Sequence, residues 1–369
     1  MKKVLFMIPT LGHGGAEKVL VNLINHMNYN DFQVTVMTLY DEGVNKQFLS
    51  NKIIYKSCFR KAIPGAGHLL KVFSPSFLYR HLVKQNYDIV ISYLEGQTAR
   101  IVSGCENPNI KKVCWIHRTM NDLKDSSRMF RNSDEAIKCY GDFDYIVSVS
   151  EDVQEAFENV FHQNHNQIVL YNTNQSDLIH EKAHEAVDTT LFLPGEIKLC
   201  GMGTLIPVKG FERLISTHKR LREQNMPVHT YILGEGPEKE KLEEMIRNDN
   251  LEQTITLLGY QENPYKYLSR CDLFVCSSFS EGFSTAATEA LICGIPVVTT
   301  KVSGMNELLG NNEYGVITDN NESSLYDAVY KVLSEERLLK YYAEKAVQRG
   351  KEFSTDYTVK AVENFLNNL

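Results

Sequence analysis

Residues 278–307 read SFSEGFSTAATEALICGIPVVTTKVSGMNE, and they predict more about the fold than any other part of the chain. The pattern predicts a short loop, a helix from Ser284 to about Cys293, and a helix stop at Gly294 and Pro296. A loop that turns into a helix exposes unpaired backbone N–H groups and the positive end of the helix dipole. Such an end suits a phosphate. The stretch therefore predicts an anion site at a helix N-terminus.

Two glutamates, Glu281 and Glu289, lie eight positions apart in this stretch. We expect Glu281 in the loop just before the helix and Glu289 about one turn inside it. One carboxylate can face a sugar beside the phosphate while the other faces a hydroxyl-bearing group farther along. A nucleotide sugar has this order of sugar, diphosphate and ribose. A purely structural Glu289 is the alternative, but apolar neighbours such as Ala290 and Leu291 predict a buried flank, which leaves this carboxylate in need of a partner.

The stretch resembles the E-x7-E motif of retaining GT-B glycosyltransferases, in particular glycosyltransferase family 4. Four more segments resemble the same family, in the same order along the chain: KKVLFMIPTLGHGGAEKVLVNLINHM at 2–27, CWIHR at 114–118, IVSVSEDVQEAF at 146–157 and MGTLIPVKGFERLI at 202–215. The resemblance covers nearly the whole chain. It implies an α/β fold of two doubly wound Rossmann-like domains that face each other across a cleft.

The length of 369 residues is too great for one core and suits two domains. Apolar runs alternate with helical patterns, which is typical of βαβ units and parallel sheets. We expect an acceptor-binding domain at 1–185 and a nucleotide-sugar domain at 186–349, with a polar linker near 172–194. The resemblance implies that a last helix, within about 350–369, packs back on the first domain. Strands are expected near 3–9, 33–39, 88–93, 112–117, 144–149, 167–170, 196–202, 228–233, 255–257, 273–276, 296–299 and 315–317.

Several residues of the second domain are expected to bind the donor. Lys209 follows the first strand of this domain by a short loop, and a lysine there can reach a diphosphate as a point charge. The family commonly has an arginine at the position of Thr204, so this loop supplies one cation only. Backbone donors are expected to complete the diphosphate clamp beside Phe283, at Ser284 and Thr285. We expect Glu281 to stabilise positive charge at the anomeric carbon and Glu289 to accept hydrogen bonds from the ribose.

Candidate residues of the first domain also follow strands. Gly12, Gly14 and Gly15 form a loop that lacks the G-x-G-x-x-G order of a dinucleotide site. We expect its N–H groups to approach phosphate, with Gly15 on the donor and Gly14 on the acceptor. His117 ends a strand and is expected to act in catalysis by positioning the donor sugar or the acceptor hydroxyl. Glu95 ends a neighbouring strand and is expected to touch the acceptor or to act as a base.

The sequence predicts neither a metal site nor a cofactor. Asp142-Phe143-Asp144 resembles a metal-binding D-x-D motif, but that motif needs a strand before it, and here the strand follows. We therefore interpret these residues as a polar turn. No His, Cys and Asp cluster has the spacing of metal ligands. The eight cysteines form no C-x-x-C pair, which favours reduced thiols in a cytosolic protein.

Charge is unevenly distributed along the chain. Residues 1–185 carry no net charge, while residues 186–369 carry −7. Within the neutral half, positions 43–87 hold eight basic residues, many aromatic and aliphatic residues, and no acid. Such a stretch can lie on an anionic membrane surface, and the alternative is a surface that is basic by chance. The acidic chain as a whole argues against nucleic-acid binding. No run of 18 apolar residues is present, so we expect a cytoplasmic protein, at most peripheral on the inner face of the membrane.

The sequence thus favours a retaining glycosyltransferase. We expect it to move a hexose from a nucleoside-diphosphate sugar, with UDP as the nucleotide, to a glycan or lipid-linked acceptor in surface polysaccharide biosynthesis. Retention is implied by the resemblance and fits the lack of a well-placed inverting base. Two alternatives stay open. One is a non-catalytic partner subunit, to which Thr204 points, and the other is a sugar-nucleotide epimerase of the same fold.

Overall fold

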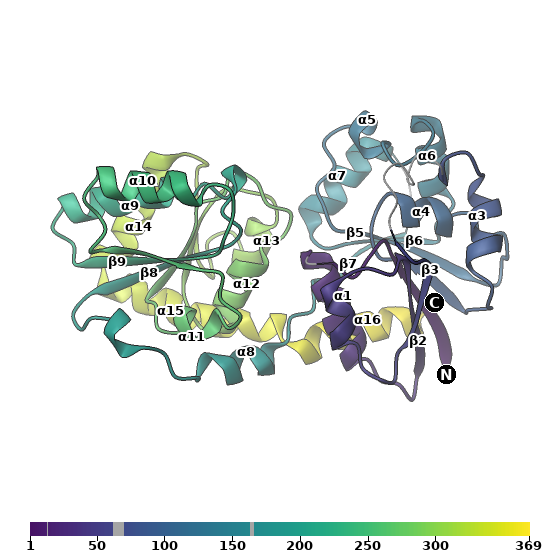
Figure 1. Ribbon diagram of the computed structural model, residues 1–369, viewed down its shortest axis with the longest axis horizontal. Helices are drawn as coiled ribbons and strands as arrows, with labels where there is room; N and C mark the ends of the chain where they lie inside the picture. The colour runs from purple at the N-terminus through teal and green to yellow at the C-terminus, as the bar shows by residue number, and fades with distance from the viewer. Residues whose placement is uncertain (13, 62–69, 163–165) are drawn as a thin grey trace. The chain divides into compact units, whose positions relative to one another are not determined.

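The computed structural model describes residues 1–12, 14–61, 70–162 and 166–369 (Figure 1). The chain divides into two compact units. The first contains Met1–Asn174 together with Thr355–Leu369, and the second contains Gln175–Ser354. Each unit is a parallel sheet covered by helices, which confirms the predicted pair of doubly wound Rossmann-like α/β domains.

Seven parallel strands form the sheet of the first unit in its described part, in the order β3-β2-β1-β4-β5-β6-β7. The chain runs outward from β1 to β3 and then returns to the other side of β1, so the order reverses between β1 and β4. Ligands bind at such a reversal, outside the carboxyl ends of the strands. The strands are β1 Lys2–Ile8, β2 Phe32–Tyr40, β3 Ile54–Phe59, β4 Ile89–Ser92, β5 Lys111–Ile116, β6 Tyr145–Ser148 and β7 Asn166–Val169.

Several helices of the first unit begin at side chains that accept hydrogen bonds from the first turn. Ser74, Asn132 and Ser150 each accept from the backbone N–H three residues ahead. Figure 1 shows α16 beside α1, and Lys2 Nζ donates to the last carbonyls of α16 at 2.9 Å. The helices are α1 Gly15–His26, η1 Val44–Phe48, α3 Pro75–Leu82, α4 Gln97–Val102, α5 Leu123–Ser126, α6 Ser133–Gly141, α7 Glu151–Phe161 and α16 Thr355–Asn367.

The described sheet of the second unit has six parallel strands in the order β10-β9-β8-β11-β12-β13. Its order reverses between β8 and β11. The strands are β8 Ile197–Met202, β9 Val228–Leu233, β10 Ile255–Gly259, β11 Leu273–Cys276, β12 Val297–Thr300 and β13 Val316–Thr318. The helices are α8 Ser176–Ala183, η2 Thr189–Leu191, η3 Pro207–Lys209, α9 Phe211–Glu223, α10 Lys239–Asn248, α11 Tyr265–Leu268, α12 Thr285–Ile292, α13 Met305–Leu309, α14 Glu322–Ser334, α15 Glu336–Gly350 and η4 Lys351–Phe353.

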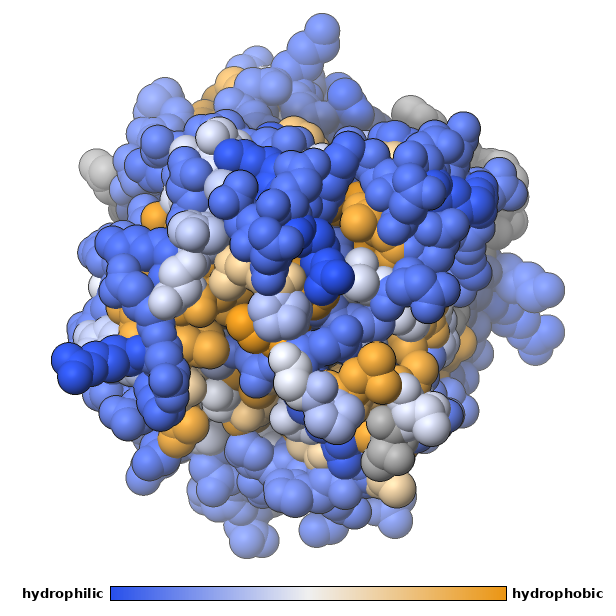
Figure 2. Space-filling view, turned by 90° about the vertical axis from the view of Figure 1, so that its left-hand side faces the viewer, coloured by the Kyte–Doolittle hydropathy of each residue, from blue (hydrophilic) through white to orange (hydrophobic). Residues whose placement is uncertain are grey.

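The surface is mostly polar around these cores. Figure 2 shows a largely hydrophilic face on which hydrophobic residues gather in small separate groups. The eight cysteines are all free thiols, and only Cys58 and Cys293 are partly accessible. Within the described ranges, no helix combines the length and apolar character that crossing a bilayer requires.

The boundary between the units differs from the expected one at 185/186, because α8 lies in the second unit. The carbonyls of Lys182 and Ala183 accept from Asn263 Nδ2 at 2.9 Å and from Ser269 Oγ at 3.0 Å. The sequence near 172–194 has only a weak pattern and therefore predicts a linker where the structure has a helix held by tertiary hydrogen bonds. The chain returns to the first unit after Ser354, a few residues beyond the predicted position.

Besides α8, the sequence prediction lacks the edge strand β3 and the helices α13 and α15. The edge strand β3 has only intermediate or exposed residues, so it lacks the buried apolar run that marks the other strands. Helix α15 fully buries only Ala346 and Gly350, both small, while Leu338, Leu339 and Tyr342 are half-buried against the core, so its apolar face is weak in the sequence. The Asp142 turn lies where the sequence placed it, after α6, with its carboxylate 3.1 Å from Lys138 Nζ.

Candidate functional site

Backbone contacts bring strand ends of the second unit close together. Gly234 follows β9 with φ +145°, and a Cβ there would lie 1.8 Å from the carbonyl oxygen of Gly203, which follows β8. Only glycine allows the two loops to approach this closely. The oxygen of Lys209, in the same loop after β8, also accepts from Ser277 Oγ at 3.1 Å, and Ser277 directly follows β11. The loops after β8, β9 and β11 thus form one edge.

An ion pair lies at this edge. Lys209 Nζ contacts both oxygens of Glu281, at 2.6 and 2.8 Å, and Ser278 Oγ donates to Glu281 Oε1 at 2.6 Å. The Glu281 side chain is 10% exposed and that of Lys209 is 26% exposed, so the pair is sheltered but accessible. The structure therefore brings together the lysine and the glutamate that the sequence singled out, with the carboxylate oriented by a serine.

The N-terminus of α12 adjoins this pair. Ser284 caps the helix by accepting from the Ala287 N–H at 3.3 Å, and Thr285 is its first residue. Gly304 holds the preceding loop in place, because a Cβ there would meet the Gly282 carbonyl oxygen at 2.7 Å. The partial positive charge of the helix end is thereby fixed beside Lys209, which favours an anion at this place.

Two other predicted donor residues lie differently. The Phe283 side chain is buried, with its ring 5.9 Å from that of Phe353 between centroids. Phe283 therefore shapes the loop through packing and offers its backbone rather than its ring. Thr204 is exposed in the loop after β8. No cation thus occupies the position where the family commonly has arginine.

Glu289 lies inside α12 and is 7% exposed. Its Oε1 accepts a hydrogen bond from the Tyr265 hydroxyl at 2.8 Å. Tyr265 is itself buried and begins α11, so it holds the carboxylate from a separate element. A buried carboxylate needs such a partner, as the apolar flank of the helix predicted.

In the first unit, the ends of β4 and β5 bring Glu95 and His117 together. Glu95 Oε2 accepts from the His117 backbone N–H at 3.1 Å, and Glu95 Oε1 lies 3.2 Å from Arg118 Nε. Arg118 also contacts Asp125 at 3.2 Å. Burial raises the pKa of Glu95, although the His117 N–H and Arg118 oppose this rise. Protonating Glu95 is therefore easier than protonating a solvated glutamate.

The imidazole of His117 is held neutral. Burial lowers the pKa of His117 to about 3, against the opposing effect of a hydrogen bond to the Tyr93 backbone. The ring also packs against Tyr93, with 4.8 Å between centroids. Its Nε2 is buried and has no hydrogen-bond partner among the described residues. Because the other ring nitrogen donates to the Tyr93 backbone, Nε2 carries the lone pair and can accept a hydrogen bond from a hydroxyl.

The glycine loop follows β1, the neighbour of β4. Gly14 is the N-terminal flanking residue of α1, Gly15 is the first residue of the helix, and both are exposed. Position 13 of this loop lies outside the described residues. The flanking residue Gly14 makes no side-chain cap to the first turn, and the Glu17 carboxylate lies against it.

Sequence reasoning missed the residues that orient the three glutamates. Ser278 and Tyr265 contact Glu281 and Glu289, and Arg118 contacts Glu95. Ser278 lies close in sequence to Glu281, and Arg118 follows His117, which is a weak signal that they belong to the site. Tyr265 gives no such signal, because it comes from another helix than Glu289. The described parts of the chain contain no group of three His, Cys, Asp or Glu side chains placed for a metal ion.

Comparison with known proteins identifies two glycosyltransferase sequence families along the chain. Residues 13–173 match the sequence model of Glycosyltransferase Family 4, and residues 185–349 match that of Glycosyl transferases group 1. The N-acetylgalactosamine-N,N'-diacetylbacillosaminyl-diphospho-undecaprenol 4-alpha-N-acetylgalactosaminyltransferase of Campylobacter jejuni is 28% identical over 96% of both chains. The lipopolysaccharide core biosynthesis glycosyltransferase LpsD of Rhizobium meliloti is 21% identical over 83% of this chain and 80% of its own.

Solved structures share the fold over the full chain. The Anabaena protein HepE in complex with UDP superposes with a TM-score of 0.79 at 18% identity, covering 100% of both chains. The lipopolysaccharide outer core galactosyltransferase WaaB superposes with a TM-score of 0.75, also at 18% identity and over 100% of both chains. Because the two sequence models together span most of the chain, it belongs to the GT-B glycosyltransferases, with a family 4 domain followed by a group 1 domain.

Proposed function

We propose that this glycosyltransferase moves a hexose from a UDP-sugar to a glycan or lipid-linked sugar with retention of configuration. The observation that carries the proposal is the Lys209–Glu281 pair beside the N-terminus of α12, with the tyrosine-held Glu289 in the same helix. UDP and UDP-glucose are bound in the HepE structures, which supports the choice of nucleotide. The Campylobacter relative is named for a diphospho-undecaprenol substrate, which supports a lipid-linked acceptor.

In this proposal the diphosphate binds to Lys209 and to the backbone N–H groups at Ser284 and Thr285. An arriving diphosphate attracts the ammonium, so Lys209 turns from Glu281 to the phosphate while Ser278 keeps the carboxylate in place. Glu281 then stabilises positive charge at the anomeric carbon, and Glu289 accepts from the ribose hydroxyls. Lys209 and the dipole of α12 supply the positive charge that the diphosphate needs, so we propose that transfer needs no metal cofactor.

The first unit contributes the groups that handle sugar hydroxyls. His117 Nε2, a buried acceptor without a described partner, accepts a hydrogen bond from a hydroxyl of the donor sugar or the acceptor. Glu95, with its raised pKa, binds the acceptor or takes up its proton. The exposed N–H groups at Gly14 and Gly15 approach phosphate, on the acceptor and the donor respectively. These roles rest on the chemistry of each group within its own unit.

We further propose that the enzyme works in surface polysaccharide assembly, such as capsule synthesis, on the cytoplasmic face of the membrane. LpsD and WaaB are named for lipopolysaccharide synthesis, which supports a related setting. The basic stretch 43–87 supports contact with an anionic surface. Residues 62–69 of this stretch lie outside the described residues.

A calorimetric titration of the purified chain with UDP, GDP and ADP tests the donor site. We expect tight binding of UDP only, unchanged by EDTA, and slow hydrolysis of a UDP-hexose when no acceptor is present. A donor array with mass-spectrometric detection then identifies the sugar, and NMR of the product reports the anomeric configuration. Binding without any transfer would indicate a partner subunit, conversion of the free UDP-sugar an epimerase, and failure to bind UDP would refute the proposal.

A further inference from the structure

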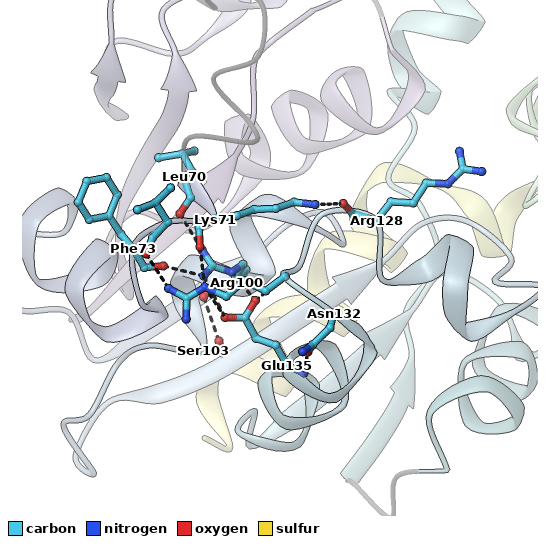
Figure 3. Close-up of polar contacts among 10 residues, drawn as sticks. Leu70, Lys71, Phe73, Arg100, Ser103, Arg128, Asn132 and Glu135 are labelled. Carbon is cyan, nitrogen blue, oxygen red and sulfur yellow. Dashed lines mark hydrogen bonds and ion pairs between the residues drawn. The ribbon is translucent and has the colours of Figure 1, made fainter.

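Two arginines in the first unit bind consecutive backbone carbonyls just before α3. Arg100 donates to the oxygens of Leu70 at 3.1 Å and Phe73 at 2.7 Å. Arg131 donates to those of Lys71 at 2.6 Å and Val72 at 2.8 Å. Figure 3 shows Arg100 between Leu70, Phe73 and Glu135. Every carbonyl of residues 70–73 is thus bound by a guanidinium.

We call the two arginines and the carbonyls of residues 70–73 the arginine clamp. Glu135 of α6 balances its charge. Both oxygens of Glu135 contact Arg100 at 2.9 Å, and Glu135 Oε2 also accepts from the Arg131 N–H at 2.7 Å. The Arg100 side chain is only 2% exposed. A bidentate ion pair of this kind, made by a buried guanidinium, fixes the position of both side chains. The backbone of 70–73 is therefore rigidly held, with its carbonyls directed at the arginines.

The side chains of the clamped segment continue into an exposed aromatic stripe. Phe77 and His81 lie one turn apart on α3, and Phe73 just before the helix continues their row. The three rings stack on one another, with centroid distances of 4.9 and 3.9 Å. Phe73 is 40% and Phe77 39% exposed, and Val72 beside them is 68% exposed. Leu78 and Tyr79 form the buried side of the helix. The aromatic stripe, here Val72, Phe73, Phe77 and His81, is thus held apolar and accessible.

A basic groove of about 460 Å³ adjoins the stripe between β3 and α3. His81 belongs to both features, and the groove is also lined by Lys56 and Lys84, with Met37, Ser57, Cys58 and Leu82. None of these lining residues is acidic, and positions 43–87 contain no acid in the sequence. The groove therefore attracts anions and joins directly to an apolar surface.

We propose that the aromatic stripe and the basic groove dock on a lipid bilayer that carries anionic phospholipids. Val72, Phe73 and Phe77 enter the interfacial region, while Lys56 and Lys84 bind headgroup phosphates. Apolar side chains flanked by charges of one sign are the combination that binds peripheral proteins to anionic membranes. The inference deepens the proposed function, since it locates the membrane contact that a lipid-linked acceptor requires.

Vesicle flotation of the full chain tests this docking, with phosphatidylcholine vesicles compared to vesicles that also contain phosphatidylglycerol. We expect the wild-type chain to float with the anionic vesicles only, and less so at high salt. Lys84→Glu should weaken binding by about fivefold or more, the effect of losing one basic residue at such a surface. Phe73→Ser combined with Phe77→Ser should weaken it by about tenfold or more. Val72→Ser, at the most exposed position, gives a milder variant that keeps α3 intact.

Matched controls separate surface chemistry from general effects. Lys360→Glu changes an exposed lysine on α16, and Leu193→Ser with Val347→Ser removes exposed apolar side chains of the second unit. These controls should float like the wild-type chain. Equal flotation with both vesicle types, or equal losses in stripe variants and controls, would overturn the inference.

UDP titration of every variant keeps the inference distinct from the proposed function. The stripe and groove variants should bind UDP as the wild-type chain does. If the wild-type chain failed to bind UDP but still floated, the donor proposal would fail and the membrane surface would stand. If the wild-type chain bound UDP but floated with neither type of vesicle, the membrane surface would fail and the donor proposal would stand.

Discussion

Glu281 is the residue on which the chemistry of the donor site depends most. Its carboxylate contacts Lys209 Nζ at 2.6 Å and accepts from Ser278 Oγ at 2.6 Å, so it keeps one partner when the lysine turns to phosphate. A carboxylate fixed in a sheltered place stabilises developing charge without having to reorganise. Glu281 is therefore suited to act on the transition state more than on the bound donor.

Replacing Glu281 by glutamine removes this charge while keeping the shape of the side chain. We expect turnover to fall by about 10²–10³-fold, with UDP binding changed far less, because the charge develops only during transfer. Steady-state rates and calorimetry on the same sample measure both quantities. Glu196→Gln, in the same unit, is a control that should transfer normally. Unchanged turnover of the Glu281 variant would refute its catalytic role.

Tyr265 positions Glu289 rather than contacting the donor in this account. Tyr265→Phe removes the 2.8 Å hydrogen bond and should weaken UDP binding by about tenfold or more, the effect of one hydrogen bond to a charged group. The preference for UDP over 2′-deoxy-UDP should shrink as well, because a Glu289 side chain that is no longer held in place makes weaker hydrogen bonds to the ribose hydroxyls. Tyr267→Phe, on the same short helix, is the matched control. A weaker affinity with an unchanged ribose preference would indicate a purely structural role.

At the scale of single residues, the sequence predicted the acids but not what orients them. Glu281 and Glu289 were found from their spacing around a helix start. Tyr265 was not, because its contact to Glu289 depends on how α11 packs on the unit, and the spacing of residues does not encode that packing. The burial that makes His117 a neutral acceptor likewise depends on its surroundings, including the Tyr93 ring.

Among the elements, α12 was predicted almost to the residue, whereas β3 was missed. Glycine and proline punctuate the end of α12, and its cap is a serine, so local chemistry defines both ends. The edge strand β3 has no such signals and pairs with β2 alone. The pairing of β3 with β2 depends on tertiary structure, and the sequence pattern of an exposed strand does not reveal it.

The element that presents the aromatic stripe depends on α6 for its position. Burial raises the pKa of Glu135, but hydrogen bonds from Arg100 and the Arg131 N–H outweigh it and leave the pKa lowered. Removing this carboxylate leaves the Arg100 guanidinium buried without a counter-charge. We expect Glu135→Ala to lower the free energy of unfolding of the first unit by about 3–5 kcal/mol.

Urea unfolding measures this loss, and Glu155→Ala on the neighbouring α7 provides an exposed glutamate as control. The contribution of Glu135 should be present at neutral pH and fade as the pH falls through its lowered pKa, because the protonated acid no longer pairs with Arg100. A loss below about 1 kcal/mol would show that the clamp adds little to stability.

At the scale of the whole molecule, two separate cores predict two unfolding transitions rather than one. The second unit should lose stability in acid because of a buried histidine. His218 is fully buried between Thr230 Oγ1 at 2.8 Å and Thr254 Oγ1 at 2.9 Å. Burial, with smaller effects of Arg222 and His229, lowers the pKa of His218 to about 3.

An unfolded histidine takes up a proton below about pH 6.5, and the folded His218 does not. The free energy of unfolding should therefore fall as the pH drops from 6.5 towards 3, by about 1.4 kcal/mol per pH unit for this residue. Urea unfolding near pH 7.5 and pH 5 checks this, with His218→Gln expected to flatten the dependence. Equal slopes for the variant and the wild-type chain would contradict the assignment.

The overall arrangement of two parallel-sheet units was predictable because alternating strands and helices leave few solutions. The division between the units was not, since residues 175–185 join the second unit through hydrogen bonds to α11 and the residues around it. The local sequence pattern thus predicts the two-unit architecture, whereas tertiary contacts determine where one unit ends and the other begins.

A crystal structure of the full chain with UDP tests the central claim most directly. The account predicts the diphosphate within hydrogen-bond distance of Lys209 Nζ and of the backbone N–H groups at Ser284 and Thr285. It also predicts the ribose hydroxyls on Glu289, still held by Tyr265. UDP bound elsewhere, with Lys209 still paired to Glu281, would contradict it.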